Sequence, residues 1–220
     1  EYGQYNVFNS WLSIASIFVS LSLTGGVYAQ GLVKFEKDRN VFTSSLQGLT
    51  LLLVAVWMVI YFIFHDFWNQ LFTLSSVQMI AMLVIIWTTA VFSFWSTEQR
   101  VNYKYKALVA ITLVVSLAKP IVGIFCVSVT NDKVSARILG IALVELIGYA
   151  WLFFIQVKRG EVLFSKKYWV YALSFNLPLV PHYLSQTVLN SADRIMIRDL
   201  VGPSDAGIYS LAYSISLLML

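Results

Sequence analysis

The sequence predicts an all-α polytopic membrane protein, because of its composition and the spacing of its apolar residues. Of the 220 residues, 59% are hydrophobic and 12% are charged, and an ordinary soluble domain carries about twice that share of charge. The apolar residues gather in runs of roughly 20 or more, the length that a helix needs to cross a bilayer. Such runs are too long for a buried strand, and they lack the alternation of a membrane β-barrel. Lipid is therefore expected to cover much of the surface.

About seven membrane-spanning helices are expected. In chain order they are Val7–Gln30, Phe42–Phe64, Leu74–Thr97, Ala107–Val129, Ala136–Val157, Trp169–Ile197 and a truncated helix that starts at Gly207. The chain starts at Glu1 in a polar turn and ends at Leu220 inside an apolar run, so we expect a fragment of a longer protein.

The basic residues predict which connections face the cytoplasm. Ten of the fifteen Lys and Arg residues fall in three alternate connections: Lys34, Lys37, Arg39, Arg100, Lys104, Lys106, Lys158, Arg159, Lys166 and Lys167. Basic connections stay on the cytoplasmic side of a membrane, so the helix Val7–Gln30 is expected to run inward from an outer Glu1. The formal charge of +4 thus reports topology and gives no reason to expect a nucleic-acid partner.

Two features of the sequence each allow both a structural and a functional interpretation. The outer connection His65–Phe72 is aromatic, which is typical of an anchor in the headgroup region; the alternative is a platform for a sugar. A polar stripe runs along the helix Val7–Gln30 and consists of Asn9, Ser13, Ser16, Ser20 and Thr24. Small polar residues favour close helix packing, and the alternative is that they line a cavity that accepts a sugar.

A short segment occurs twice. Glu1–Ser10 aligns without gaps with Asp205–Ser214, with Gly, Tyr and Ser identical at the third, fifth and tenth positions. Both segments are expected outside, just before a helix that runs inward, and six helices separate them. Two six-helix halves related by an axis along the membrane normal are a known transporter plan.

These segments resemble the polysaccharide-exporting flippases of the Wzx type. The likeness lies in Glu1–Tyr5, which resembles their first outer loop, and in Asn176–Leu184, Ala192–Ile197 and Gly202–Tyr209, which resemble their seventh helix and the loop after it. The superfamily also contains the MATE drug exporters and the lipid II flippase. The resemblance implies a two-lobed transporter of twelve to fourteen helices. Residues 1–165 would be most of the first six-helix lobe, without its first helix, and residues 166–220 the truncated start of the second lobe.

The resemblance also implies a function. An undecaprenyl-diphosphate-linked oligosaccharide, the repeat unit of an O-antigen, capsule or exopolysaccharide, would be flipped across the bacterial inner membrane by alternating access. The membrane lipids would hold its tail, and the coupling ion, a proton or sodium, is left open. The alternative is a MATE-like, ion-coupled multidrug antiporter, in which an acidic cavity would be expected.

Lys119 lies in the middle of the expected helix Ala107–Val129, where an ammonium group costs roughly 2.5–3.5 kcal/mol. It belongs to a stripe at helical spacing that consists of Thr112, Ser116, Lys119, Gly123 and Cys126. In one interpretation Lys119 and Ser116 line a central cavity, and the cation attracts a pyrophosphate. In another, Lys119 pairs with Glu145 in the next helix, and in a third it snorkels toward the interface. The first two are compatible in different transport states.

The helix Trp169–Ile197 is interrupted by Pro178 and Pro181, and broken helices at membrane depth line cavities in transporters. Its polar residues expected in the cavity are Asn176, His182, Gln186 and Asn190. At about 1.5 Å per residue the helix is longer than the hydrocarbon core is thick. Asp193 and Arg194 are therefore expected near the outer surface, as an outer gate.

The sequence contains no pattern of a known catalytic site. A phosphate-binding loop of the Walker type, a nucleophile elbow and a zinc motif are all missing, and two His with the single Cys126 do not make a metal site. We therefore expect no enzyme activity, no cofactor and no metal.

Overall fold

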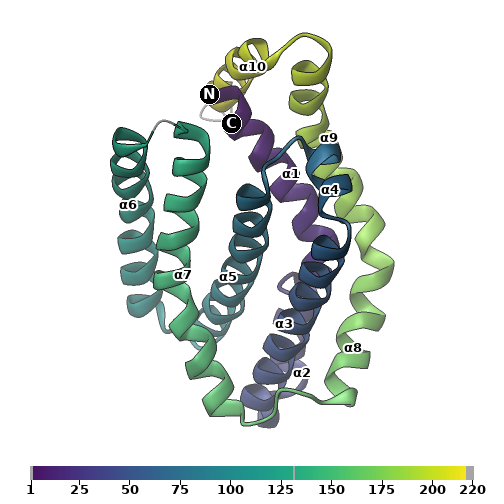
Figure 1. Ribbon diagram of the computed structural model, residues 1–220. Coiled ribbons are helices and arrows are strands. Elements are labelled where there is room, and N and C mark those ends of the chain that lie inside the picture. The colour runs from purple at the N-terminus through teal and green to yellow at the C-terminus, as the bar shows by residue number, and fades with distance from the viewer. Residues whose placement is uncertain (1, 131, 217–220) are drawn as a thin grey trace.

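The computed structural model describes residues 2–130 and 132–216, and within these ranges the chain is helical without any strand (Figure 1). In order, the elements are α1 (Tyr2–Ser20), α2 (Gly26–Lys34), the 3-10 turn η1 (Glu36–Asp38), α3 (Arg39–Ile63), α4 (His65–Phe72), α5 (Ser76–Val101), α6 (Tyr105–Val129), α7 (Lys133–Gly160), α8 (Lys166–Asn176), the 3-10 turn η2 (Leu177–Leu179), α9 (Val180–Leu200) and α10 (Pro203–Ser216).

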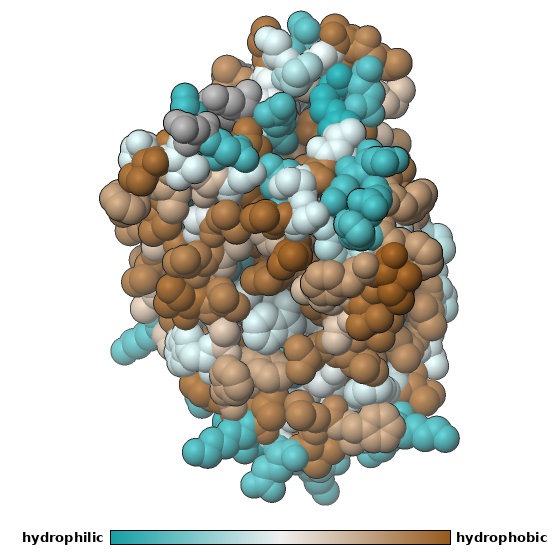
Figure 2. All heavy atoms as spheres, in the orientation of Figure 1, coloured by the Kyte–Doolittle hydropathy of each residue, from teal (hydrophilic) through white to brown (hydrophobic). Residues whose placement is uncertain are grey.

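Four uninterrupted helices in the described part of the chain are long and apolar enough to cross a membrane. They are Glu36–Ile63, Ser76–Val101, Tyr105–Val129 and Lys133–Gly160, which correspond to the second to fifth expected spans. α6 lies at the edge of the bundle against α7 and leaves large side chains such as Leu113, Ile121 and Phe125 exposed. Figure 2 shows an apolar band between two hydrophilic ends. The prediction of an all-α polytopic membrane protein is thus confirmed.

The first expected span is not one helix. The helix that starts at Tyr2 ends at Ser20, and Leu21 and Ser22 adopt left-handed backbone angles, with φ of 48° and 51°. The chain turns there and re-enters a helix at Gly26. The prediction of a single helix over Val7–Gln30 was wrong because helical periodicity does not reveal where neighbouring elements support a break.

The expected break in the sixth span is present. α8 ends at Asn176, the short turn η2 contains Pro178, and α9 starts at Val180. Proline has no amide hydrogen and cannot continue the hydrogen-bond ladder. The buried Asn176 donates from Nδ2 to the carbonyl oxygen of Leu21, 3.0 Å away. The two broken helices therefore meet, and one satisfies a carbonyl that the other leaves open, as backbone at membrane depth requires.

A buried polar network joins α3, α5 and α7 near one end of the bundle. Arg159 donates to both carboxylate oxygens of Glu98, at 2.9 and 3.0 Å. Gln156 donates to the same carboxylate at 3.1 Å and accepts from Gln47 at 2.6 Å. Because the bidentate pair and its amide neighbours leave little of the carboxylate unbonded, this network ties three spanning helices together.

Candidate functional site

A cavity of about 510 Å³ lies between α1, α5 and α9, alongside the middle of α5. Its wall consists of Leu12, Ser13, Ser16, Ile17, Ser20, Ser22, Thr24, Gly25, Ile85, Ile86, Thr89, Ala90, Ser93, Tyr183, Gln186 and Thr187. We call this space the hydroxyl cavity, because Ser, Thr and Tyr supply most of its polar groups. Among the residues that the structure describes, none in this wall has a charged side chain.

The hydroxyl cavity sits where the two broken helices meet. Ser22, Thr24 and Gly25 come from the turn between α1 and α2, and Tyr183 follows shortly after η2. A side chain at Gly25 would place its Cβ 3.5 Å from the Tyr183 hydroxyl, so the tyrosine packs closely over the turn. The breaks in the two helices thus form the end of the cavity at the α1–α2 turn, whereas the uninterrupted helix α5 supplies another wall.

Ser13, Ser16 and Ser20 of the stripe on α1 line the hydroxyl cavity, and Thr24 joins them from the turn. That this cavity accepts a sugar stays a prediction. Each of the three serines also bonds to its own helix: Ser13 to Asn9 O at 2.9 Å, Ser16 to Ser13 O at 2.8 Å and Ser20 to Ser16 O at 2.7 Å. These bonds hold the oxygen atoms in fixed positions at the cavity wall.

Lys119 and Glu145 form an ion pair at the α6–α7 boundary. Lys119 Nζ lies 2.6 Å from Glu145 Oε1, and Glu145 Oε2 accepts from Thr88 at 2.9 Å and from Thr89 at 3.1 Å. Glu145 is 4% exposed, while a third of the Lys119 side chain remains exposed. The pair that the sequence indicated is therefore present. Thr89 lines the hydroxyl cavity, so Glu145 lies directly behind its wall.

Of the other predicted site residues, the structure brings only Gln186 into the wall of the hydroxyl cavity. Asn176 lies just below, bonded to the α1–α2 turn. His182 is exposed beside Tyr183, and Ser116 is exposed on α6. The side chain of Asn190 falls outside the described part of the structure. The cavity-lining roles of Lys119, Glu145, Ser116, Asn176, His182 and Asn190 stay predictions.

The two predicted gate residues both contact α10. Asp193 accepts a hydrogen bond from the Tyr209 hydroxyl, and the guanidinium of Arg194 lies 4.6 Å from the centre of the Tyr213 ring. A positive charge over a tyrosine face is an attractive contact. Both residues therefore fasten α9 to α10, and their role as an outer gate stays a prediction.

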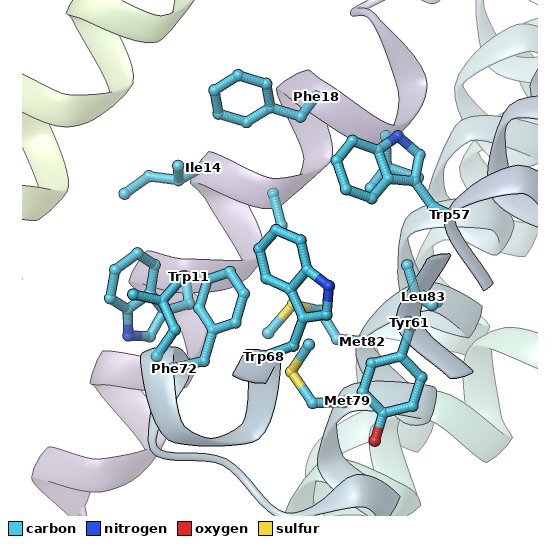
Figure 3. Close-up of a pocket in the computed structure, with 13 residues that line it drawn as sticks. Trp11, Ile14, Phe18, Trp57, Tyr61, Trp68, Phe72, Met79, Met82 and Leu83 are labelled. Carbon is cyan, nitrogen blue, oxygen red and sulfur yellow. The ribbon is translucent and has the colours of Figure 1, made fainter. Parts of the chain in front are cut away.

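A second cavity, of about 330 Å³, lies among α1, α3, α4 and α5 (Figure 3). Trp68 and Phe72 of α4 project into it, and the ring centres of Trp11 and Phe72 lie 4.6 Å apart in an edge-to-face arrangement. Met79 and Met82 close the opposite side. Because its wall is almost wholly apolar, this aromatic cavity offers few hydrogen bonds to a sugar, and α4 is better described as a packed anchor.

Sequence reasoning missed several polar residues that the structure brings together. Thr89 and Ser93 on α5, and Tyr183 and Thr187 on α9, line the hydroxyl cavity. On α9, the helical spacing to Gln186 could have identified Tyr183, which lies three residues earlier. For the α5 residues no signal in the sequence shows which face meets α1.

Comparisons with known proteins agree with this architecture. A family described as "Polysaccharide biosynthesis protein" matches residues 1–220. The protein named "Lsg locus putative protein 1", from Haemophilus influenzae, is 33% identical over 97 residues, which are 40% of this chain and 23% of that relative. The chain thus matches less than a quarter of that relative's length. No solved structure matches the chain.

Proposed function

This chain belongs to the polysaccharide biosynthesis protein family, and from that premise we propose that it is part of a flippase for lipid-linked oligosaccharides. The substrate would be an undecaprenyl-diphosphate-linked repeat unit, moved from the cytoplasmic to the outer leaflet of the bacterial inner membrane. The name of the Haemophilus influenzae relative refers to a locus and adds no substrate. The protein would act as a transporter and not as an enzyme.

The observation that carries this proposal is the hydroxyl cavity at the meeting point of two broken helices. A saccharide needs a polar wall at membrane depth, and Ser16, Ser20 and Gln186 help to provide one. Discontinuous helices are typical of transporter sites near the bilayer midplane. α9 and α10 would belong to the second lobe of the whole protein, so their contacts with α1 would be the contacts that open and close in alternating access.

The rival function, an ion-coupled antiporter for cationic drugs, fits this cavity less well. A cation that leaves water needs a carboxylate or a comparable set of dipoles. The described residues in the wall of the hydroxyl cavity include no acid, and Glu145 behind it is already paired with Lys119. The energy for transport would come either from a coupling ion, a proton or sodium, or from a downstream step that traps the flipped substrate.

Deletion of the gene tests the proposal. We expect the deletion strain to lose its surface polymer and to accumulate lipid-linked repeat units on the cytoplasmic leaflet, and we expect the full-length gene to restore both. A strain that keeps its polymer but becomes sensitive to cationic drugs would favour the antiporter instead.

A further inference from the structure

Four hydroxyls in the wall of the hydroxyl cavity, those of Ser13, Ser16, Ser20 and Thr89, already use their hydrogen within the protein. A hydroxyl has one hydrogen and two acceptor lone pairs. On α1, Ser16 and Ser20 use that hydrogen on backbone carbonyl oxygens at 2.8 and 2.7 Å. On α5, Thr89 faces an ion-paired carboxylate of Glu145 at 3.1 Å. A carboxylate cannot donate, so Thr89 has to, and its lone pairs remain for a ligand. These hydroxyls on α1 and α5 therefore present acceptors to the cavity.

A polar wall without charge discriminates among ligands. An anion placed there would lose its hydration and would find no cationic side chain among the described residues of the wall, which is costly at membrane depth. A cation would find acceptors, but no carboxylate of the wall compensates for its lost hydration. A neutral group with several O–H or N–H donors loses the least hydration free energy and forms the most hydrogen bonds with this wall.

The third wall completes the match to a sugar. Gln186 on α9 carries both an amide donor pair and a carbonyl acceptor, and the Tyr183 hydroxyl can do either. Sugar hydroxyls also both donate and accept, and acetamido groups of amino sugars match a glutamine amide. The volume of about 510 Å³ falls within the range usual for small-molecule sites, roughly 300–1,000 Å³.

We propose that the hydroxyl cavity selects uncharged, donor-rich sugar residues and excludes sugars that carry a carboxylate or phosphate. The diphosphate of the carrier lipid then stays outside this cavity while the first neutral sugars occupy it. This inference rests on the flippase function proposed above and specifies its substrate class as neutral repeat units.

The test uses the full-length protein in proteoliposomes and two synthetic substrates that differ in one group. Both are trisaccharides of hexose and N-acetylhexosamine residues on the same prenyl diphosphate, and the second has the hexose nearest the diphosphate oxidised to a uronate. We expect at least roughly tenfold faster movement of the neutral substrate, the discrimination that about 1.4 kcal/mol gives. Equal or faster movement of the uronate would overturn the inference.

Movement of neither substrate would count against the flippase function itself. Binding to the purified full-length protein then decides the inference separately. Tenfold tighter binding of the neutral trisaccharide supports a neutral-sugar site, whereas equal or tighter binding of the uronate overturns it.

A matched pair of variants locates the effect. Ser16 and Ser128 each donate to a carbonyl three residues earlier in their own helix, at 2.8 and 2.7 Å, but only Ser16 lines the cavity. Ser16→Ala should raise the KM for the neutral substrate roughly fivefold, the effect of one hydrogen bond, and Ser128→Ala should leave it unchanged. Equal effects of the two changes, or none at Ser16, would contradict an acceptor role for the cavity wall.

Discussion

At the scale of single residues, Lys119 and Glu145 form an ion pair between α6 and α7. The two side chains differ in how deeply they are buried. Glu145 is buried and bonded to Thr88, Thr89 and Lys119, while Lys119 is partly exposed. A buried carboxylate whose cation is removed is left uncompensated, whereas removal of both charges leaves a neutral interface. The pair can therefore be dissected by comparing single and double changes.

Lys119→Met should lower the stability of the full-length protein by about 3 kcal/mol, because it leaves Glu145 buried without its cation. The double variant Lys119→Met with Glu145→Gln should regain most of that stability, since a glutamine can still accept from the two threonines. Abundance and the thermal midpoint of the detergent-purified protein measure both effects, and Lys106→Met, at an exposed lysine, is the control. A double variant that folds normally but moves no substrate would instead support a role of the cation in substrate binding.

Asp132 predicts a pH dependence at the start of α7. Its side chain accepts from the Ser135 amide at 3.1 Å, and hydrogen bonds from the Ser135 side chain and backbone hold the pKa of Asp132 below its usual value. Because the folded pKa is lowered, the stabilisation is present above the unfolded pKa of about 3.9 and is lost as the pH falls through the folded pKa.

Asp132→Ala should therefore weaken the first turn of α7 by about 1 kcal/mol at neutral pH. Hydrogen exchange of the amides of residues 134–136 measures this loss, and the difference from the unchanged protein should vanish in strong acid. Asp132→Ser keeps a cap that does not titrate, so its exchange should not show the acid-dependent step. An Asp132→Ala profile equal to the wild type at neutral pH would refute the capping role.

The residue scale also shows what spacing alone can predict about a site. The stripe of Ser13, Ser16 and Ser20 was identifiable because helical periodicity places these residues on one face. Periodicity does not say which helix that face meets, so Thr89 and Ser93 on α5 could not be assigned to the same cavity. The side of α6 from which Lys119 reaches Glu145 is likewise fixed by packing and not by sequence order.

At the scale of elements, the apolar runs predicted the four uninterrupted spans to within several residues, because length and hydropathy alone decide whether a helix crosses a bilayer. The break at Pro178 was also predictable, since proline interrupts the hydrogen-bond ladder. The turn at Leu21 and Ser22 was not, because Asn176, which is 155 positions away in the chain, supplies the donor that supports it. Local sequence does not encode such a partner.

The repeated segments at the starts of α1 and α10 lie against each other. A Cβ atom at Gly3 would lie 2.0 Å from the carbonyl oxygen of Pro203 and 2.9 Å from the amide nitrogen of Gly207, and Gly207 is the residue that aligns with Gly3 in the repeat. Equivalent residues of two halves meet where a two-fold axis passes between them. Only glycine allows this approach, so a side chain at this position should separate α1 from α10.

Gly3→Val should force α1 and α10 apart and weaken the closure of this end. Gln4 and Pro203 line one surface pocket there, so a Gln4→Cys, Pro203→Cys pair on a Cys126→Ser background reports closure through disulfide formation. We expect Gly3→Val to reduce cross-linking severalfold, whereas Gly26→Val, where a Cβ would meet no atom within 4 Å, should not. Undiminished cross-linking in Gly3→Val would show that the helices tolerate a side chain there.

At the scale of the whole molecule, the distribution of charge and apolar surface orients the bundle. The connections η1, α5–α6 and α7–α8 lie toward the lower end in Figure 1, and the ten basic residues that the sequence singled out lie in them or in the adjoining ends of the helices. Hydrophilic side chains also gather at that end in Figure 2, below the apolar band. The expectation that these three connections share one side of the membrane is consistent with this arrangement.

We predict that this basic end faces the cytoplasm, because basic connections resist translocation. Lys104 lies exposed in the α5–α6 connection, and Gln70 lies exposed on α4 at the opposite end. On a Cys126→Ser background of the full-length protein, an impermeant thiol reagent should label Gln70→Cys in intact cells and Lys104→Cys only after the membrane is permeabilised. Gln70 on α4 lies at the same end of the bundle as the contact of α1 with α10 (Figure 1). The same labelling therefore decides whether that contact closes the outer end of the hydroxyl cavity. Labelling of Lys104→Cys in intact cells would show that the bundle has the opposite orientation. The α1–α10 contact would then close the cytoplasmic end.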